Sequence, residues 1–327
     1  MEKIAIFDTS YGTFNMGDFI ICECANREIE YIIKNKFVVR TGTHNPQYIS
    51  YQYTNKSDKV KFYKNCKYKF ILGTNIIKNN LFKRSVDWNV SIFDYKFYEG
   101  VILVGVGLDG TFSNVKNIYT RLLYKKMFNK NYYHSTRDEK TKKFLNNLGY
   151  RAINTGCPTM WNFTKDFCKK IPQKKSDKVI FTLTDYRESE KYDIQLLDIL
   201  INEYKELYFW CQGSSDYEYL KSISGKYFNK INIIYPDLKQ YDEFLLKNEV
   251  DYIGTRLHAG IYSLRHKRRT IIIEIDNRVK DMKETYNLPT IDRNKINTEL
   301  KALINSEFET KININEENIN KWKEQFK

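Results

Sequence analysis

Short apolar runs alternate with amphipathic segments along the whole sequence, a pattern typical of repeated strand–helix–strand units. The first half predicts a strand just before Gly105 and others at residues 3–7, 37–40, 68–72, 132–135 and 152–155. The second half predicts strands at residues 179–183, 207–211, 231–234, 250–253 and 270–275. The main helices are predicted at residues 19–33, 115–127, 135–148, 192–204, 217–223, 238–246, 257–264 and 312–326. We therefore expect an α/β protein with doubly wound sheets.

A polar, Lys-rich stretch divides this pattern. Residues 169–178 contain a Pro and several charges, which makes them the best candidate for a linker between domains. The sequence thus predicts one Rossmann-like domain at residues 1–168 and another at residues 178–327. The amphipathic helix at the end of the chain can pack back on the first domain.

Composition and motifs limit the classes of partner and cofactor that the chain can bind. The chain has 327 residues and a net charge of +14, which reflects either compositional bias towards Lys or a basic surface for an anionic partner. Zinc-finger spacing, a basic region with heptads and aromatic ribonucleoprotein motifs are all missing from the sequence, so we expect no nucleic acid among the partners. No DxD, HExxH or Cys/His cluster occurs, so we expect no metal.

Localisation is predicted from the cysteines and the apolar runs. The six cysteines form no CxxC pair, and the longest apolar run, residues 101–108, is too short to span a membrane. The first strand begins directly at the N-terminus, without a signal-peptide pattern. We therefore expect a cytoplasmic protein with reduced thiols.

The strongest candidate chemistry follows the apolar run at residues 250–253. Gly254 ends this run, Thr255 can cap the following helix, and Arg256 and His258 stand at the turn. Ligands bind at the carboxyl ends of parallel strands, and helix N-termini attract anions. The alternative is structural: Arg256 pairs with a carboxylate and His258 is a half-buried histidine with satisfied hydrogen bonds.

Three other turns are weaker candidates. Asn15, Gly17 and Asp18 lie between a strand and a helix, either as an anion cradle or as simple helix caps. The GxGxxG pattern at residues 105–110 admits a dinucleotide, but the next strand offers no acid for a ribose. Arg137 begins a helix that Ser135 or Thr136 can cap, and it either reaches a cleft or pairs with an acid.

Taken together, these motifs resemble the polysaccharide pyruvyl transferase family. The resemblance runs in family order over about residues 1–290. Its most specific part is the block Arg256-Leu257-His258-Ala259 with Asp276 downstream. The remaining parts are Asn15-x-Gly17-Asp18, Gly105-Val106-Gly107, Arg137-Asp138 and the segment that ends in Arg278.

This resemblance implies two Rossmann-like domains in a GT-B-type arrangement with an interdomain cleft. It implies transfer of the pyruvyl group of phosphoenolpyruvate, as a ketal, onto sugar hydroxyls of a cell-surface glycan precursor, without a further cofactor. Arg256 and Arg187 would hold the donor. Further binding residues would be Leu257, Asn15, Gly17, Asp18, Gly107, Arg137 and Arg278.

The residues fit this chemistry independently. Arginine forks bind phosphate and carboxylate, and protonation of the methylene carbon needs a group such as His258. The resemblance further implies a lipid-linked sugar acceptor at the cytoplasmic face of the membrane, and the net charge of +14 suits peripheral association with its anionic inner face. One alternative is a GT-B-type glycosyltransferase in which Arg187 and Arg256 grip the diphosphate of a nucleotide sugar. Another is a basic α/β protein that binds nucleic acid or membrane without catalysis.

Overall fold

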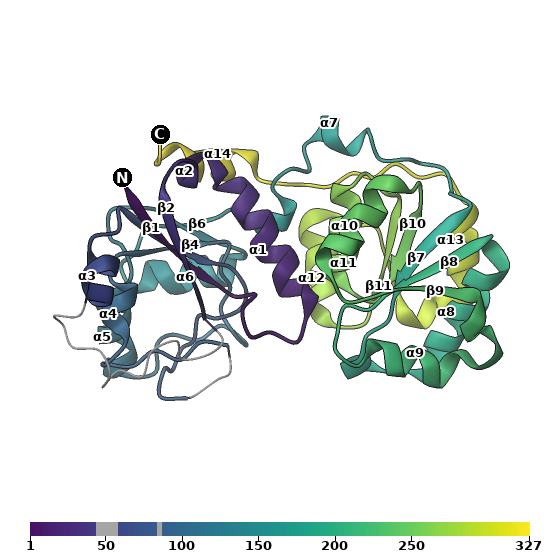
Figure 1. Cartoon of the computed structure of the whole chain (residues 1–327), viewed down its shortest axis with the longest axis horizontal. Coiled ribbons are helices and arrows are strands. Elements are labelled where there is room, and N and C mark those ends of the chain that lie inside the picture. The colour runs from purple at the N-terminus through teal and green to yellow at the C-terminus, as the bar shows by residue number, and fades with distance from the viewer. Residues whose placement is uncertain (44–57, 84–86) are drawn as a thin grey trace. The chain divides into compact units, whose positions relative to one another are not determined.

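The protein consists of two compact units in a computed structural model that describes residues 1–43, 58–83 and 87–327 (Figure 1). Unit 1 comprises Met1–Thr13, Ile21–Trp161 and Asn315–Lys327. Unit 2 comprises Phe14–Ile20 and Asn162–Ile314. The predicted linker, residues 169–178, therefore falls inside unit 2 in this division. Helix α1 (Met16–Glu28) begins in unit 2 and continues in unit 1.

Unit 1 is built on parallel strands in the order β2-β1-β3-β4. A parallel bridge from Val106 to Thr136 connects this sheet with the parallel pair β5–β6. The strands of unit 1 are β1 (Lys3–Asp8), β2 (Phe37–Gly42), β3 (Tyr68–Leu72), β4 (Val101–Val104), β5 (His134–Thr136) and β6 (Ala152–Asn154). Its other helices are α2 (Glu30–Ile33), α3 (Asp58–Lys64), α4 (Tyr95–Tyr98), α5 (Ile118–Met127), α6 (Glu139–Asn147), the 3-10 turn Pro158–Met160 and α14 (Glu316–Glu324).

Successive side chains of each strand point to opposite faces of the unit 1 sheet. Phe7 on β1 packs against Tyr98 of α4, with ring centroids 4.4 Å apart. On β3, Phe70 instead contacts Trp322 of α14 and the nearby Phe326. The sheet of unit 1 is thus buried on both faces, as its near-continuous apolar strands predict.

Unit 2 is built on a six-stranded parallel sheet in the order β12-β11-β10-β7-β8-β9. The strands are β7 (Lys178–Thr182), β8 (Glu206–Trp210), β9 (Ile231–Ile234), β10 (Asp251–Gly254), β11 (Thr270–Glu274) and β12 (Thr290–Asp292). The helices are α7 (Lys165–Cys168), α8 (Glu190–Glu203), α9 (Asp216–Ser224), α10 (Leu238–Lys247), α11 (Leu257–Arg265), α12 (Asn277–Tyr286) and α13 (Lys301–Asn305). Further 3-10 helices lie at Asp185–Arg187, Gly225–Lys230 and Arg293–Lys295, and a π-helix lies at Ile296–Leu300.

Strand order in unit 2 reverses at one place. The chain runs outward from β7 to β9 and then returns to β10 on the other side of β7, so the switch point lies between β7 and β10. In doubly wound sheets this is where ligands bind.

Helices cover both faces of this sheet (Figure 1). On one face Phe181 and Phe209 pack in a core with Leu196 and Leu200 of α8. On the other face Trp210 stacks on Tyr241 of α10, with ring centroids 3.9 Å apart. Helices α10 and α11 lie side by side there, joined by a hydrogen bond of 2.6 Å between the hydroxyls of Tyr241 and Ser263.

Two predicted helix caps are wrong. Arg256, not Thr255, is the N-cap of α11, and it makes no side-chain cap. The Thr255 hydroxyl instead lies 2.8 Å from the Thr184 hydroxyl, which ties β10 to β7. Helix α6 is capped by Asp138, whose Oδ1 accepts from the Thr141 amide at 2.8 Å, because β5 continues through Ser135 and Thr136.

Some predicted elements also differ in length. The predicted helix at residues 19–33 is two helices, α1 and α2, and the predicted last helix is the shorter α14. In the described part of the chain, no helix combines the length and apolar character needed to cross a membrane.

Candidate active site

The carboxyl ends of β7, β8 and β10 bring polar side chains to the switch point of unit 2. Arg256 follows β10, Asp185 follows β7, and Asp216 begins the helix after β8. All three stand close together because β10 pairs with β7 and β7 pairs with β8.

Arg256 is buried in an ion-pair cluster. Its exposed fraction is 2 %, and its Nη2 lies 2.9 Å from Asp185 Oδ1. Nη2 and Nε also donate to the two carboxylate oxygens of the fully buried Asp216. Nε further donates to the Leu183 carbonyl at 3.0 Å. Burial, the largest single effect, would lower the pKa of the guanidinium, but Asp216, Tyr186 and Asp185 together outweigh it and the pKa is raised.

The structural alternative for Arg256, pairing with a carboxylate, is therefore present in the fold. It leaves one nitrogen without a partner: among the described residues, nothing accepts a hydrogen bond from the two N–H groups of the buried Nη1. Two carboxylates already face this guanidinium. Arg256 can consequently donate hydrogen bonds from Nη1 to an anion, but it brings no uncompensated charge to the site.

Asp216 holds the loop as well as the arginine. Its Oδ2 accepts from the amides of Gln212 at 3.0 Å and Gly213 at 2.7 Å. Gly213 is needed for close approach, since a Cβ at this position would lie 2.2 Å from Arg256 Nη2.

The N-terminal turn contributes a second group of residues to the same unit. The Met16 amide donates to the Gln212 carbonyl at 2.9 Å, and Asn15 forms an antiparallel bridge with Gly213. Asn15 Oδ1 accepts from the Gly17 amide at 2.9 Å and from Gln212 Nε2 at 2.8 Å. Asn15 thus caps α1, as one interpretation of the sequence held, and also joins the turn to the loop after β8.

His258 lies in the first turn of α11, against this turn. Its exposed fraction is 7 %. A Cβ on Gly17 would lie 3.1 Å from His258 Nδ1, 3.1 Å from Asn15 Oδ1 and 3.2 Å from Gln212 Nε2. The His258 imidazole and the side-chain amides of Asn15 and Gln212 therefore all pack against Gly17. The sequence motifs, each of which describes a single turn, did not predict this arrangement.

The other predicted binding residues of unit 2 are Leu257, Arg187, Arg278 and Asp18. Leu257 is buried at the start of α11. Arg187 is exposed, and its carbonyl accepts from Arg293 at 2.7 Å; its own guanidinium makes no ion pair within the described residues. Arg278 lies at the start of α12, with Nη2 at 3.5 Å from Asp276. Asp18 is half-buried in the first turn of α1.

Gly107 and Arg137 meet in unit 1. A Cβ on Gly107 would lie 2.5 Å from Arg137 Cδ and 2.0 Å from Asn75 Oδ1. The Arg137 amide donates to the Val106 carbonyl at 3.1 Å. The glycine of the GxGxxG pattern thus permits close packing at the carboxyl ends of β3, β4 and β5, the structural role weighed against a dinucleotide turn.

Three residues of the switch-point cluster were not predicted as site residues: Asp185, Gln212 and Asp216. Each follows a predicted strand at its carboxyl end, and that position was the available signal. Their importance depends on which strands are neighbours, and strand order could not be derived from apolar periodicity. Within residues 1–43, 58–83 and 87–327, no group of three or more His, Cys, Asp or Glu side chains is arranged to hold a metal.

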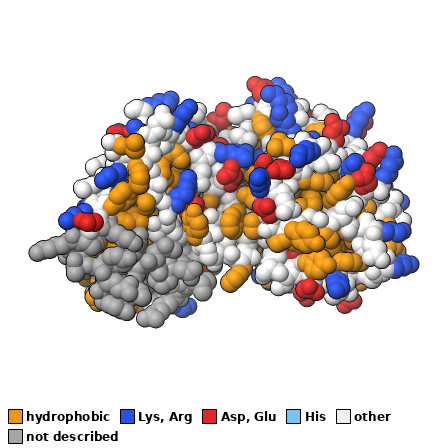
Figure 2. Space-filling view, viewed as in Figure 1, with side chains coloured by type: hydrophobic (Ala, Val, Ile, Leu, Met, Phe, Trp, Pro, Cys, Tyr) orange, Lys and Arg blue, Asp and Glu red, His pale blue; other side chains and the backbone are white. Residues whose placement is uncertain are grey.

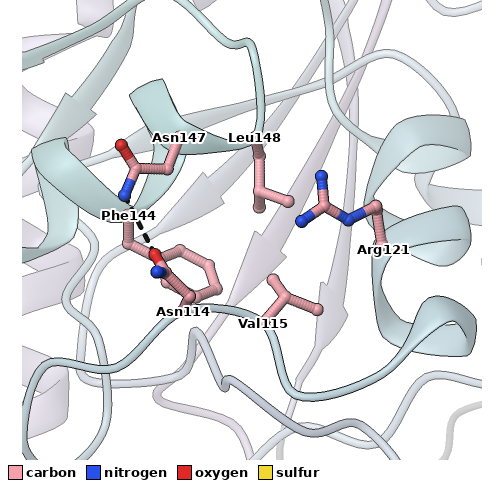
Figure 3. A pocket seen from close by; sticks show the side chains of 6 residues that line it. All are labelled: Asn114, Val115, Arg121, Phe144, Asn147 and Leu148. Carbon is pink, nitrogen blue, oxygen red and sulfur yellow. Dashed lines mark hydrogen bonds between the residues drawn. The ribbon is translucent and has the colours of Figure 1, made fainter.

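A pocket of about 230 Å³ lies elsewhere, on unit 1 (Figure 3). Phe144, Leu148 and Val115 form its apolar part, and Arg121 reaches towards it from α5. Its Asn147 donates to Asn114 at 2.9 Å. None of the predicted site residues lines this pocket.

Surface charge does not single out one site either. On the face seen in Figure 2, Lys and Arg side chains are spread over the surface among Asp and Glu. The basic side chains visible on this face are thus distributed and not gathered in one patch.

Comparison with known sequences decides the family. The sequence profile described as polysaccharide pyruvyl transferase matches residues 15–277, which begin at the Asn15 turn and extend past the Arg256–His258 block. The chain belongs to the polysaccharide pyruvyl transferase family. Among curated proteins, none matches the sequence significantly. As a member of this family, the protein is a transferase.

A solved structure with a TM-score above 0.5 shares the fold of this pyruvyl transferase family member. UDP-GlcNAc 2-epimerase of Methanocaldococcus jannaschii, in complex with UDP-GlcNAc and UDP, superposes with a TM-score of 0.51 at 15 % identity, over 98 % of this chain and 97 % of that one. The Neisseria meningitidis UDP-GlcNAc 2-epimerase gives 0.49 at 11 % identity, over 99 % and 98 %. E. coli heptosyltransferase WaaC gives 0.41 at 10 % identity, over 83 % and 88 %. The expected class, α/β with Rossmann-like domains of the GT-B type, is confirmed.

Proposed function

We propose that this protein transfers the pyruvyl group of phosphoenolpyruvate onto hydroxyls of a sugar in a cell-surface glycan precursor, forming a ketal. The observation that carries the proposal is the position of His258. It lies in the first turn of α11 beside Gly17, two residues from the buried Arg256, at the switch point of a doubly wound sheet. A titratable group and a guanidinium N–H thus stand together where such folds bind ligands.

In the proposed reaction, each proton that is transferred has a donor and an acceptor. His258 gives a proton to the methylene carbon of phosphoenolpyruvate, which makes the neighbouring carbon oxocarbenium-like. A first sugar hydroxyl adds to that carbon and loses its proton, which restores the charged imidazole. The C–O bond to phosphate then breaks, a second hydroxyl closes the ketal, and its proton leaves with phosphate. Phosphoenolpyruvate and a diol thus give a pyruvyl ketal and hydrogen phosphate.

The donor anion needs positive charge that Arg256 does not supply by itself. Arg256 faces Asp185 and Asp216, so we assign it only hydrogen bonding from Nη1 to the donor. Arg187 lies two residues after Asp185 and has no carboxylate partner among the described residues, so it supplies the uncompensated charge. A guanidinium can bind phosphate or carboxylate through two parallel hydrogen bonds.

One experiment tests the reaction. The protein is incubated with phosphoenolpyruvate and cell-surface glycan precursors, and phosphate release and the mass of the glycan are measured. We expect phosphate release together with a pyruvyl mass increment. Release of phosphate without a change in the glycan, or no release with any precursor, would contradict the proposal.

The second candidate is a glycosyltransferase that uses a nucleotide sugar. The observation that favours it is the fold shared with the Methanocaldococcus jannaschii epimerase, whose structure contains UDP-GlcNAc and UDP. Thermal-shift measurements with phosphoenolpyruvate and with UDP sugars distinguish the two. A ligand that binds only the folded state raises the melting temperature, and the rise increases with the ratio of its concentration to its Kd. Stabilisation by UDP sugars but not by phosphoenolpyruvate would favour the glycosyltransferase.

We further propose that the acceptor is linked to a lipid and that the protein works at an anionic membrane surface in the cytoplasm. Helix α5 supports this with an exposed face of mixed apolar and basic character. Ile118 is 75 % exposed and Leu122 is 51 % exposed. The same face exposes Arg121, Lys125 and Lys126, and α5 contains no acid. Basic residues near an anionic leaflet contribute about 1 kcal/mol each.

Liposome sedimentation tests this surface. We expect the protein to sediment with phosphatidylglycerol vesicles at low salt, and the triple variant R121E/K125E/K126E to stay in solution. The matched control K191E/K221E/K226E changes the net charge equally at exposed positions of unit 2, and it should still sediment. Equal loss in both variants would mean that net charge, not α5, governs binding.

A further inference from the structure

Two polar atoms in the candidate active site are buried and have no partner among the described residues. They are Arg256 Nη1, a donor, and Gln212 Oε1, an acceptor. Gln212 is 3 % exposed and Arg256 is 2 % exposed. Buried polar atoms are almost always hydrogen-bonded, because an unmet hydrogen bond away from water costs free energy. Two such atoms at one switch point therefore indicate ligand-binding groups.

The orientation of the Gln212 amide is fixed by its neighbours. Asn15 Oδ1 already accepts from the Gly17 amide at 2.9 Å, so the group of Gln212 that approaches it at 2.8 Å must be the donor Nε2. The backbone of Gln212 is held as well, by Asp216 Oδ2 at 3.0 Å and by the Met16 amide at 2.9 Å. Oε1 is consequently a preorganised acceptor that cannot rotate away without breaking the bond to Asn15.

An acceptor of this kind selects the chemistry of its partner. An amide oxygen only accepts, so it is satisfied by a hydroxyl and not by an ionised phosphate or carboxylate. Arg256 Nη1 has the opposite preference, since it only donates. The two atoms therefore favour different ligand groups: an anion is favoured at Arg256 and a hydroxyl at Gln212.

We propose that Gln212 Oε1 binds a hydroxyl of the sugar acceptor and is a specificity-determining residue of the site. Gln212 lies beside the proposed acid, because Gln212 Nε2 and His258 Nδ1 both lie within 3.2 Å of the place that a Cβ of residue 17 would occupy. A sugar held by Oε1 thus has its hydroxyls near the group that protonates the donor. This assignment rests on the proposed pyruvyl transfer and names the part of the site that selects its acceptor.

The test compares Q212M with the wild-type protein on deoxygenated sugars. Methionine keeps the length of the side chain but removes both polar atoms. The probes are methyl hexosides and, for the best of them, its singly deoxygenated forms. We expect one deoxygenation to lower the kcat/KM of the wild-type protein by about tenfold or more, as for a lost hydrogen bond to a buried group. In Q212M the same deoxygenation should change kcat/KM by less than about twofold, since the coupling is gone.

Three further measurements keep the outcomes distinct. Calorimetry with phosphoenolpyruvate should give nearly the same affinity for Q212M, and a large loss would assign Oε1 to the donor instead. The variant Q212E keeps an acceptor oxygen but loses the Nε2 donor to Asn15, so it should recover only part of the deoxygenation penalty. Equal penalties in the wild-type protein and in a folded Q212M would overturn the assignment. If neither protein turns over phosphoenolpyruvate, the proposed function fails, and binding of the methyl hexosides measured by NMR still tests the hydroxyl site.

Discussion

Arg256 shows how a buried ion pair changes the meaning of a predicted site residue. Its guanidinium is shared between Asp216 and Asp185, so it both orders the loop after β8 and presents Nη1. Removing one partner of a buried pair leaves the other charge without compensation, which costs about 3–5 kcal/mol. A loss of donor affinity in a variant of Arg256 therefore needs a stability measurement beside it.

We accordingly expect R256A to lower the free energy of unfolding by about 3–5 kcal/mol, since Asp216 stays buried. R256K should be less destabilised, because it keeps a charge near Asp216, but it loses the planar fork. Urea unfolding of both variants measures this. An unfolding free energy of R256A equal to that of the wild-type protein would mean that the pair with Asp216 does not stabilise the fold.

Arg187 should affect the donor without affecting stability. Its side chain is exposed and has no ion pair among the described residues, so R187A should unfold like the wild-type protein. A charge-assisted contact contributes roughly 1.5–3 kcal/mol, so the affinity for phosphoenolpyruvate should fall about tenfold to a hundredfold. Calorimetry measures the affinity, and R187K should restore it only in part. Unchanged affinity in R187A would remove Arg187 from the donor site.

His258 is expected to act in the chemical step. Positioned acid–base catalysis contributes about 10²–10⁴ in rate, so H258Q should lose turnover by that order while it stays folded and binds phosphoenolpyruvate. H266Q is the matched control, because His266 ends the same helix and contacts Asp242 at 2.9 Å, outside the site. Near-normal turnover in a folded H258Q would remove the histidine from the mechanism.

At the scale of elements, Gly17 allows the N-terminal turn to pack closely against α11. A Cβ there would lie 3.1–3.2 Å from three polar atoms, so G17A must move His258, Gln212 or Asn15 by a few tenths of an ångström. Small misplacements of catalytic groups are costly, and we expect turnover to fall roughly tenfold with little loss of stability. Measured kcat and melting temperature test this. A large drop in melting temperature would instead indicate a packing role for Gly17.

Strand β5 carries a histidine whose charge state matters for stability. His134 Nδ1 accepts from the Leu103 amide at 3.2 Å, and its Nε2 lies 2.8 Å from the Asn129 carbonyl. Burial lowers the pKa of this imidazole from 6.5 to about 4. Because the folded protein disfavours the charged imidazole, unfolding is opposed most when His134 is neutral. This contribution of His134 to stability is complete above about pH 6.5 and is lost as the pH falls towards 4.

The corresponding loss is of the order of 3 kcal/mol between these pH values. Denaturant unfolding from pH 7 to pH 4 measures it. The variant H134N keeps an acceptor near the Leu103 amide but cannot titrate, so its stability should be lower and should depend less on pH. Parallel pH dependences for H134N and the wild-type protein would contradict the role of His134.

The sequence predicted strands best where their apolar runs are buried. The strands at residues 179–183 and 250–253 correspond to β7 and β10, whose apolar runs are continuous because helices cover both faces. Helices of four or five residues, such as α4 and α13, could not be predicted, since one helical turn carries no periodicity. Caps failed where a strand ran on or where a hydroxyl bonded across the sheet, as at Thr255.

At the scale of the whole molecule, the site depends on strand order. Asp216 lies 40 residues before Arg256 along the chain and meets it because β8, β7 and β10 are neighbours. The division into units also places Phe14–Ile20 with unit 2, so that Asn15 and Gly17 join the group around His258. Apolar periodicity predicted the doubly wound class, but not these contacts between distant segments.

Solvent deuterium tests the central claim, protonation of the methylene carbon during pyruvyl transfer. The reaction is run in deuterium oxide with phosphoenolpyruvate and a glycan precursor, and the ketal is analysed by mass spectrometry and NMR. The imidazole proton of His258 exchanges with solvent between turnovers, so we expect one deuterium in the methyl group of the ketal and one phosphate released for each ketal formed. A ketal methyl group without deuterium, or transfer of a sugar from a nucleotide with no phosphate from phosphoenolpyruvate, would contradict this mechanism.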